Sequence, residues 1–137
     1  MKARLVIASN NEKKKRELLQ IIGDLDLEIA TLKEFPQAPV VEEDGLTFQE
    51  NAVKKAREIA EFTGCLTLAD DSGLEVDALG GLPGVHSARF AGEPSDDERN
   101  NRKLLEMLEG VPAQERTARF RCVIAIAFPD GRVETAE

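Results

Sequence analysis

The fold class is decided by residues 4–22, which read RLVIASNNEKKKRELLQII. A strand is predicted over residues 4–8, because its apolar run, residues 5–8, does not alternate with polar residues, which is typical of a strand covered on both faces. Ser9-Asn10-Asn11 is a turn and helix-start signal, and the pattern that follows predicts a helix over residues 12–22. Residues 27–32 alternate as a second strand. This order of strand, helix and strand predicts an α/β fold with a central sheet flanked by helices.

A second helix is predicted from Thr47 to about Thr63. Thr47-Phe48-Gln49-Glu50 has the form of a capping box, in which Thr47 accepts from the amide of Glu50 and the side chain of Glu50 reaches back. Gly64 supplies the stop. Its apolar positions recur at helical spacing and are expected to face the core: Ala52, Ala56, Ile59 and Ala60.

The rest of the chain predicts two more strands and one more helix. Residues 65–69 form a short apolar strand that is expected to break at Asp70-Asp71-Ser72-Gly73. A second capping box, starting at Ser95, opens a helix over residues 95–109. Residues 116–128 form the longest strand, and the turn signal at residues 129–131 predicts a hairpin.

The composition excludes several classes of protein. Eighteen Lys and Arg against 26 Asp and Glu give a net charge of −8, which argues against a nucleic-acid binder. The longest apolar run, residues 122–128, is far too short to span a bilayer, and the N-terminus has no signal-peptide pattern. Two cysteines and one histidine exclude a zinc site, and Cys65 and Cys122 are expected to be buried thiols in a reducing cytoplasm.

Residues 9–15 are the first candidate site. They join a strand to a helix, and ligands of open α/β sheets bind at the carboxyl ends of strands. The free amides of a helix N-terminus attract an anion, and Lys13 and Lys14 would be unfavourable there unless a polyphosphate lay between them and the amides. The alternative is a solvated basic helix face. The segment is neither a P-loop nor a dinucleotide fingerprint.

Asp70-Asp71-Ser72-Gly73 is the second candidate site. Adjacent carboxylates after a buried strand favour Mg²⁺, which binds oxygen ligands and bridges to phosphate. Because adjacent strand residues point to opposite faces, only one Asp is expected to face the ligand. The alternative is an Asx turn without function. Glu42-Glu43-Asp44 is a third acidic cluster. Together the lysines, amides and carboxylates predict hydrolysis at phosphorus.

Three motifs in this order resemble the inosine/xanthosine triphosphate pyrophosphatases: residues 9–14 (SNNEKK), 47–56 (TFQENAVKKA), and 69–74 with 83–89 (ADDSGL and PGVHSAR). The resemblance covers essentially the whole chain. It implies a mixed sheet in two lobes with a nucleotide cleft between them, and a homodimer. It also implies Mg²⁺-dependent hydrolysis of noncanonical purine triphosphates (ITP, dITP, XTP) to the monophosphate and pyrophosphate, which cleanses the nucleotide pool, in the cytoplasm.

The resemblance also assigns roles to residues. Asp71 is similar to the general base and metal ligand of the family, and Glu43 to a second metal ligand, with the neighbouring Glu42 left open. Lys14 and Lys55 match lysines that contact the phosphates, and Ser72 is expected to touch the substrate. Arg89 and residues 80–87 match the family but are interpreted as mainly architectural. The remaining residues of the phosphate cradle are Ser9, Asn10, Asn11, Glu12 and Lys13.

The sequence departs from the family at its end. The family continues with a Phe-Gly-Tyr-Asp segment and a Ser-His-Arg segment that recognise the purine, and neither is present here. Residues 1–137 are therefore expected to form a single pyrophosphatase-like domain that lacks those segments, and the chain is expected to be a fragment. Two alternatives remain: a pyrophosphatase for other modified or pyrimidine nucleotides, and a fragment that binds nucleotide without turnover.

Overall fold

A five-stranded sheet forms the centre of the protein, with strand order β2-β1-β3-β4-β5. The structure is a computed structural model and describes residues 3–137. β1 runs parallel to β2 and β3, whereas β4 is antiparallel to β3 and β5 is antiparallel to β4. The sheet is therefore mixed, which confirms the predicted α/β class. Its strands are β1 (Ala3–Ile7), β2 (Leu27–Thr31), β3 (Leu66–Val76), β4 (Ala118–Ala127) and β5 (Val133–Ala136).

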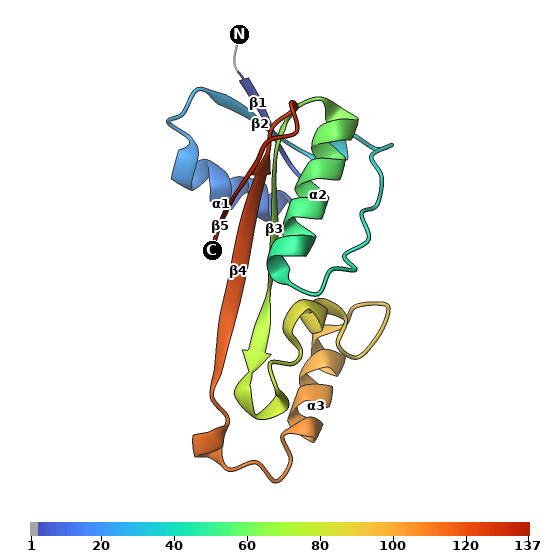
Figure 1. Cartoon of the computed structure of the whole chain (residues 1–137), viewed down its shortest axis with the longest axis vertical. Helices are drawn as coiled ribbons and strands as arrows, with labels where there is room; N and C mark the ends of the chain where they lie inside the picture. Colours follow the sequence, from blue (N-terminus) through green and yellow to red (C-terminus); the bar gives the residue numbers. More distant parts are fainter. Residues whose placement is uncertain (1–2) are drawn as a thin grey trace.

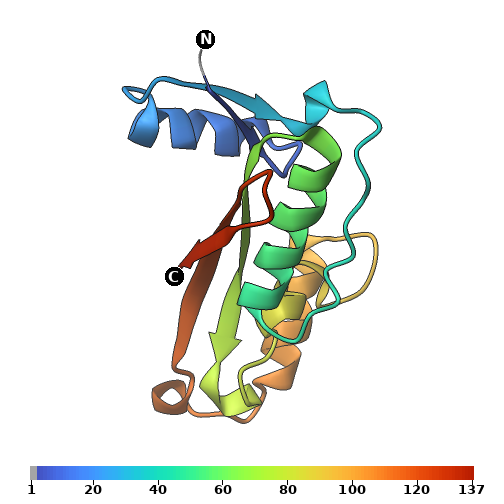
Figure 2. The same ribbon diagram turned by 45° about the horizontal axis from the view of Figure 1, so that its top comes forward.

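Residues 3–137 contain three α-helices: α1 (Glu12–Ile22), α2 (Phe48–Thr63) and α3 (Asp97–Met107). Figures 1 and 2 show α1 and α2 on opposite sides of the sheet, and α3 beside the far end of the long β3–β4 pair. Four short 3-10 helices complete the fold: η1 (Leu32–Glu34), η2 (Asp77–Leu79), η3 (Gly84–Arg89) and η4 (Ala113–Glu115). Within residues 3–137, no helix is both long enough and apolar enough to cross a membrane.

The ends of α2 follow from local chemistry. Thr47 Oγ1 accepts from the amide of Glu50 at 3.0 Å, as the capping box predicts. The return bond differs, because Glu50 Oε2 accepts from the amide of Leu46 at 2.7 Å rather than from Thr47. The helix ends at Gly64, whose φ of 69° is the left-handed conformation that glycine adopts without strain. The predicted bounds of α2 are confirmed to within one residue.

The hydrophobic core lies between α2 and one face of the sheet. All four predicted core positions of α2 are buried, and they meet Val6, Ala69, Val123, Ala125 and Ala127 of the strands. The opposite face of β4 is open instead, with Phe120 86% and Ile124 38% exposed. Cys122 lies on that face and is exposed, so the expectation that it is a buried thiol is wrong.

Two predicted boundaries are wrong. The strand predicted over residues 65–69 continues to Val76, because Thr67–Val76 pairs residue by residue with β4. The helix α3 is capped by Asp96, which accepts from the amide of Arg99, rather than by Ser95, whose hydroxyl donates to the carbonyl of Ala88. In the first case a long-range strand pairing overrides the local pattern, and in the second the Ser95 hydroxyl is already engaged by the preceding segment.

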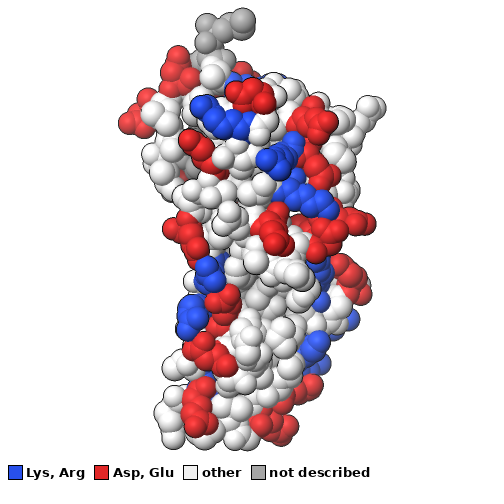
Figure 3. All heavy atoms as spheres, in the orientation of Figure 1, with Lys and Arg blue, Asp and Glu red and all other residues white. Residues whose placement is uncertain are grey.

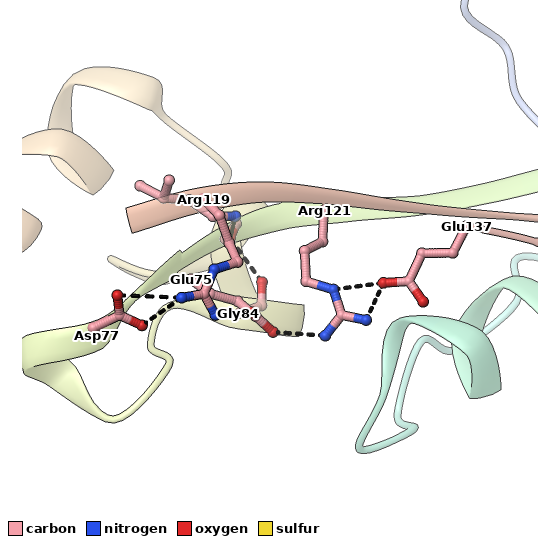
Figure 4. A network of polar contacts seen from close by, with 8 residues as sticks. Glu75, Asp77, Gly84, Arg119, Arg121 and Glu137 are labelled. Atoms are coloured by element: carbon pink, nitrogen blue, oxygen red, sulfur yellow. Dashed lines mark hydrogen bonds and ion pairs between the residues drawn. The ribbon is translucent and has the colours of Figure 1, made fainter. Parts of the chain in front are cut away.

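Charged side chains tie the far end of β3 to β4 (Figure 4). Arg119 contacts Asp77 at 3.0 Å and Glu75 at 3.7 Å, and Arg121 bridges Glu75 to Glu137 after β5. These pairs are cross-strand neighbours on a partly exposed surface, where such contacts add modest stability and fix register.

Candidate functional site

The candidate site lies where the strand connections change direction. The chain passes from β1 through α1 to β2, and then returns through α2 to β3 on the other side of β1. Because such crossovers are right-handed, this reversal puts α1 and α2 on opposite faces. β1 pairs with β3 as far as Leu68, whose carbonyl also accepts from the amide of Ala8. Beyond Leu68, β3 continues to Val76 without β1 beside it. Ligands of α/β sheets bind at such a point.

Ser9, Asn10 and Asn11 form the turn that leaves β1. Ser9 Oγ accepts from the amide of Asn11 at 3.0 Å, and Asn11 caps α1 by accepting from the amide of Lys13 at 2.9 Å. Ser9 and Asn10 line a pocket of about 370 Å³ together with Glu43 and Lys55. The structure therefore brings this turn, the acidic cluster and the second helix to one pocket.

Glu12 and Lys13, two residues of the predicted phosphate cradle, do not face the pocket. Glu12 accepts from the hydroxyl of Thr31 at 3.3 Å, toward β2. Lys13 lies on the surface of α1, 4.0 Å from Glu17 at the next turn. Neither residue lines the pocket beside Lys55.

Glu43 and Lys55 form a partly buried ion pair. Lys55 Nζ lies 2.8 Å from Glu43 Oε1, and the two side chains are 18% and 33% exposed. Lys55 projects from α2, and Glu43 belongs to the acidic loop (residues 36–46) that leads into this helix. Glu42 is exposed and contributes only its backbone carbonyl, which accepts from Lys54 at 2.8 Å. Glu43 is therefore the carboxylate that faces the pocket.

Asp71 lies on β3 on the same side of the sheet as α2. Its Oδ2 accepts from Asn51 Nδ2 at 3.2 Å. Burial raises the pKa of the Asp71 carboxyl, and the negative charges of Glu43 and Asp70 raise it further, against the lowering effects of Asn51 and Lys55. A carboxyl whose pKa moves toward neutral pH is a better proton acceptor. Glu43, Lys55 and Asp71 thus lie close enough to influence one another.

Asp70 and Ser72 point to the other face of β3. Asp70 Oδ1 lies 2.8 Å from Lys14 Nζ of α1, and Ser72 is an exposed residue paired with Cys122. The two neighbouring carboxylates therefore have partners on opposite faces of β3, as strand alternation predicts, and which of them faces the ligand stays a prediction. Lys14 and Lys55 approach β3 from opposite faces, near the edge that β1 leaves uncovered after Leu68.

The acidic loop is held by residues that the sequence did not single out for function. Asn51 Oδ1 accepts from the amide of Gly45 at 2.7 Å, and Lys54 contacts Asp44 Oδ1 at 2.9 Å. Arg89 donates to the backbone carbonyl of Glu43 at 2.7 Å from η3. The motif around Asn51 was part of the family resemblance, but no periodicity or spacing pointed to this bridging role.

The acidic side chains fit a magnesium ion only if other ligands join them. Glu43 and Asp71 offer the hard carboxylate oxygens that Mg²⁺ prefers. Among residues 3–137, however, no three His, Cys, Asp or Glu side chains gather closely enough to hold a metal ion by themselves. Mg²⁺ usually keeps waters and completes its shell with substrate phosphate oxygens, so one or two carboxylates suit it.

A larger hollow of about 790 Å³ lies between the start of α2 and residues 80–86. Its lining includes Val123, which pairs with Asp71, and the charged residues Arg121 and Glu75. Figure 3 shows acidic and basic side chains intermingled over one face of the molecule rather than gathered into a basic patch.

Comparisons with known proteins give one consistent result. A sequence model described as Ham1 family matches residues 5–137. The dITP/XTP pyrophosphatase of Desulforamulus reducens is 62% identical over 134 residues, which cover 98% of this chain and 67% of the relative. That of Geobacter sulfurreducens is 56% identical over 129 residues, covering 94% and 65%.

Solved structures agree with the sequence relatives. The Ham1 protein of Staphylococcus aureus matches with a TM-score of 0.86 and 42% identity, over 96% of this chain and 67% of that one. A HAM1 protein from Coxiella burnetii matches with a TM-score of 0.89 and 40% identity, over 97% and 68%. The chain thus spans about two thirds of the length of these relatives.

Proposed function

The chain belongs to the Ham1 family, and we propose that it hydrolyses noncanonical purine nucleoside triphosphates such as dITP and XTP. The products are the nucleoside monophosphate and pyrophosphate, so the reaction breaks the bond between the α- and β-phosphates with water. The observation that carries this proposal is the Glu43–Lys55 ion pair in the pocket beside the turn after β1, with Asp71 within range of both charges, in a chain 62% identical to a dITP/XTP pyrophosphatase.

The phosphates are held by groups from both sides of β3. Ser9 and Asn10 line the pocket beside Lys55, whose ammonium group compensates phosphate charge. Lys14 reaches the uncovered edge of β3 from α1 and exchanges part of its contact with Asp70 for a phosphate oxygen. Asn11 caps α1 by accepting from the amide of Lys13, and Glu12 ties the start of this helix to Thr31 of β2, so these residues keep the turn in place. Ser72 meets the substrate at the α1 face of the edge.

Asp71 accepts the proton of the attacking water. Its raised pKa and its fixed bond to Asn51 suit this role. Glu43 and Asp71 would hold Mg²⁺ together with phosphate oxygens. When bound there, the ion neutralises phosphate charge and orients the chain of phosphates. Removing unusual purines in this way cleanses the nucleotide pool of the cytoplasm, and the active assembly is a homodimer.

The test is pyrophosphate release from dITP, XTP, dATP and dUTP, with Mg²⁺ and with EDTA. We expect hydrolysis of dITP and XTP only with Mg²⁺, and a loss of about 10²-fold or more in kcat for Asp71→Asn. Faster turnover of dUTP would favour a pyrophosphatase for other nucleotides. Calorimetric binding of dITP without pyrophosphate release would favour a binding fragment, and full activity of Asp71→Asn would remove Asp71 as the base.

A further inference from the structure

We propose that Asn51 is a positioning residue that fixes Asp71 and the acidic loop relative to each other. The inference rests on the proposed function, because it concerns the carboxylates assigned there to the reaction. Asn51 is 1% exposed, and its one side chain makes bonds to both elements. Asp71 belongs to β3 and Gly45 to the acidic loop, and within residues 3–137 no other side chain bonds to both.

The direction of the Asn51 amide follows from chemistry. The backbone N–H of Gly45 is a donor, so the atom 2.7 Å from it must be the carbonyl oxygen Oδ1. The amide nitrogen Nδ2 therefore faces Asp71 and donates to its Oδ2 at 3.2 Å. Turning the amide over would oppose two donors at Gly45 and two acceptors at Asp71. Each contact thus holds the other in place.

This geometry determines which oxygen of Asp71 is available. Oδ2 is engaged by Asn51, and this is the one hydrogen bond that the carboxylate makes within residues 3–137. Oδ1 is left to accept from a water or a ligand group. The same amide anchors Gly45, two residues after Glu43, so it also limits the motion of the carboxylate paired with Lys55.

Packing alone does not account for an asparagine at this position. Asparagine is a weaker helix former than leucine or alanine, and a buried amide is unfavourable unless its polar atoms are bonded. The neighbouring buried positions Ala52 and Ala56 of α2 are apolar. The two bonds of Asn51 are therefore the feature that favours an amide at this position of α2.

Two substitutions separate the two bonds. Asn51→Asp keeps an oxygen for the amide of Gly45 but replaces the amide donor to Asp71 with a second carboxyl group that competes for a proton, whereas Asn51→Ala loses both contacts. For Asn51→Asp we expect kcat for dITP to fall by about tenfold or more with KM changed by less than about twofold. Hydrogen exchange at the amide of Gly45 should stay close to that of the parent in Asn51→Asp and rise by about tenfold in Asn51→Ala.

The structure offers a matched control. Asn100 of α3 is also buried, accepts from the amide of Ala91 at 2.8 Å and donates to the carbonyl of Ala88 at 2.9 Å. Asn100→Asp removes the equivalent donor at the end of η3, without touching Asp71 or Gly45, so it should lower Tm while kcat falls clearly less than in Asn51→Asp. An equal fall of kcat in both variants, or an unchanged kcat in Asn51→Asp, would overturn the proposal. If Asn51→Asp does not fold, the kcat threshold alone is applied to Asn51→Ser, whose shorter side chain reaches neither partner.

A third variant tests the coupling by hydrogen exchange, without any measurement of enzyme activity. Asp71→Ala removes the acceptor of Asn51 Nδ2, so the amide gains freedom and exchange at Gly45 should rise by about threefold or more. Unchanged exchange at Gly45 in Asp71→Ala would overturn the coupling. If the parent releases no pyrophosphate from dITP or XTP, the proposed function fails, whereas the coupling of Asp71 to the loop is still decided by exchange.

Discussion

Gly73 lies two residues beyond Asp71 on β3, where a side chain has no room. A Cβ atom added there would lie 2.4 Å from the carbonyl oxygen of Gly84 and 2.6 Å from Ser87 Oγ, whereas an ordinary contact is at least 3.4 Å. Neither of these two oxygen atoms can move away without breaking other contacts. The first belongs to the backbone, and the second accepts from the amide of Leu74 and donates to the carbonyl of Gly84. Gly73→Ala must therefore push η3 away from β3 by about 1 Å.

The expected loss of stability is about 2 kcal/mol, the middle of the range for overpacking a well-packed site. The entropy of unfolding of 137 residues is about 0.3 kcal/mol per kelvin, so Tm should fall by about 7 °C. Activity should fall as well. Arg89 of η3 donates to the carbonyl of Glu43, and displacement of a catalytic group by about 1 Å costs tenfold or more in kcat.

Urea unfolding followed by circular dichroism measures the first effect, and pyrophosphate release from dITP measures the second. The double variant Gly73→Ala with Ser87→Ala provides the control, because it removes one of the two atoms that clash. Its loss of stability should be smaller than the sum of the two single losses. A free energy of unfolding for Gly73→Ala equal to that of the parent would refute the packing argument.

Three further predictions concern the site and its scaffold. Because burial raises the pKa of Asp71, its stabilising contribution is complete in acid and is lost as the pH rises through the folded-state pKa. Asp71→Asn should therefore raise Tm at neutral pH and gain nothing in acid, and a lower Tm at neutral pH would contradict this. Lys55→Met leaves Glu43 and Asp71 without their cation, so the free energy of unfolding in urea should fall by about 1–2 kcal/mol and kcat by about 10²-fold. An unchanged free energy of unfolding would show that the ion pair at 2.8 Å contributes nothing to stability. Thr47→Ala removes the cap bond to Glu50 and should lower the free energy of unfolding by about 1 kcal/mol at unchanged kcat, and equal stability would exclude the cap.

The helices α1 and α2 were predictable because their signals are local. Asn11 and Thr47 cap them as short polar side chains do, and Gly64 ends α2 in a conformation that other residues adopt with strain. The apolar spacing of α2 also identified its buried face. By contrast, α1 buries no residue fully, and its apolar residues Leu19 and Ile21 are 41% and 75% exposed. A hydrophobic stripe predicts which face can be buried, but not whether a partner covers it.

The strand β3 was not predictable beyond Ala69 from its own residues. Asp-Asp-Ser-Gly is a composition typical of a turn. Its partners in β4 follow about fifty residues later, so no local pattern reports the pairing of Asp71 with Val123 or of Gly73 with Arg121. Register of this kind is set by the buried face of the sheet as a whole.

The length of β3 fixes the position of the proposed base, Asp71. A carboxylate on a loop moves with the loop, whereas Asp71 is held within a ten-residue ladder, with the buried Asn51 against its side chain. Alternation along the strand then separates Asp70 toward α1 from Asp71 toward α2, so Asp70 contacts Lys14 whereas Asp71 lies within range of the charge of Lys55. Since β1 stops beside Leu68, this stretch of β3 is an edge that both helices can reach. A ligand carrying several negative charges, lying across that edge, is the arrangement that lets Lys14 and Lys55 act on one molecule from opposite faces of the sheet.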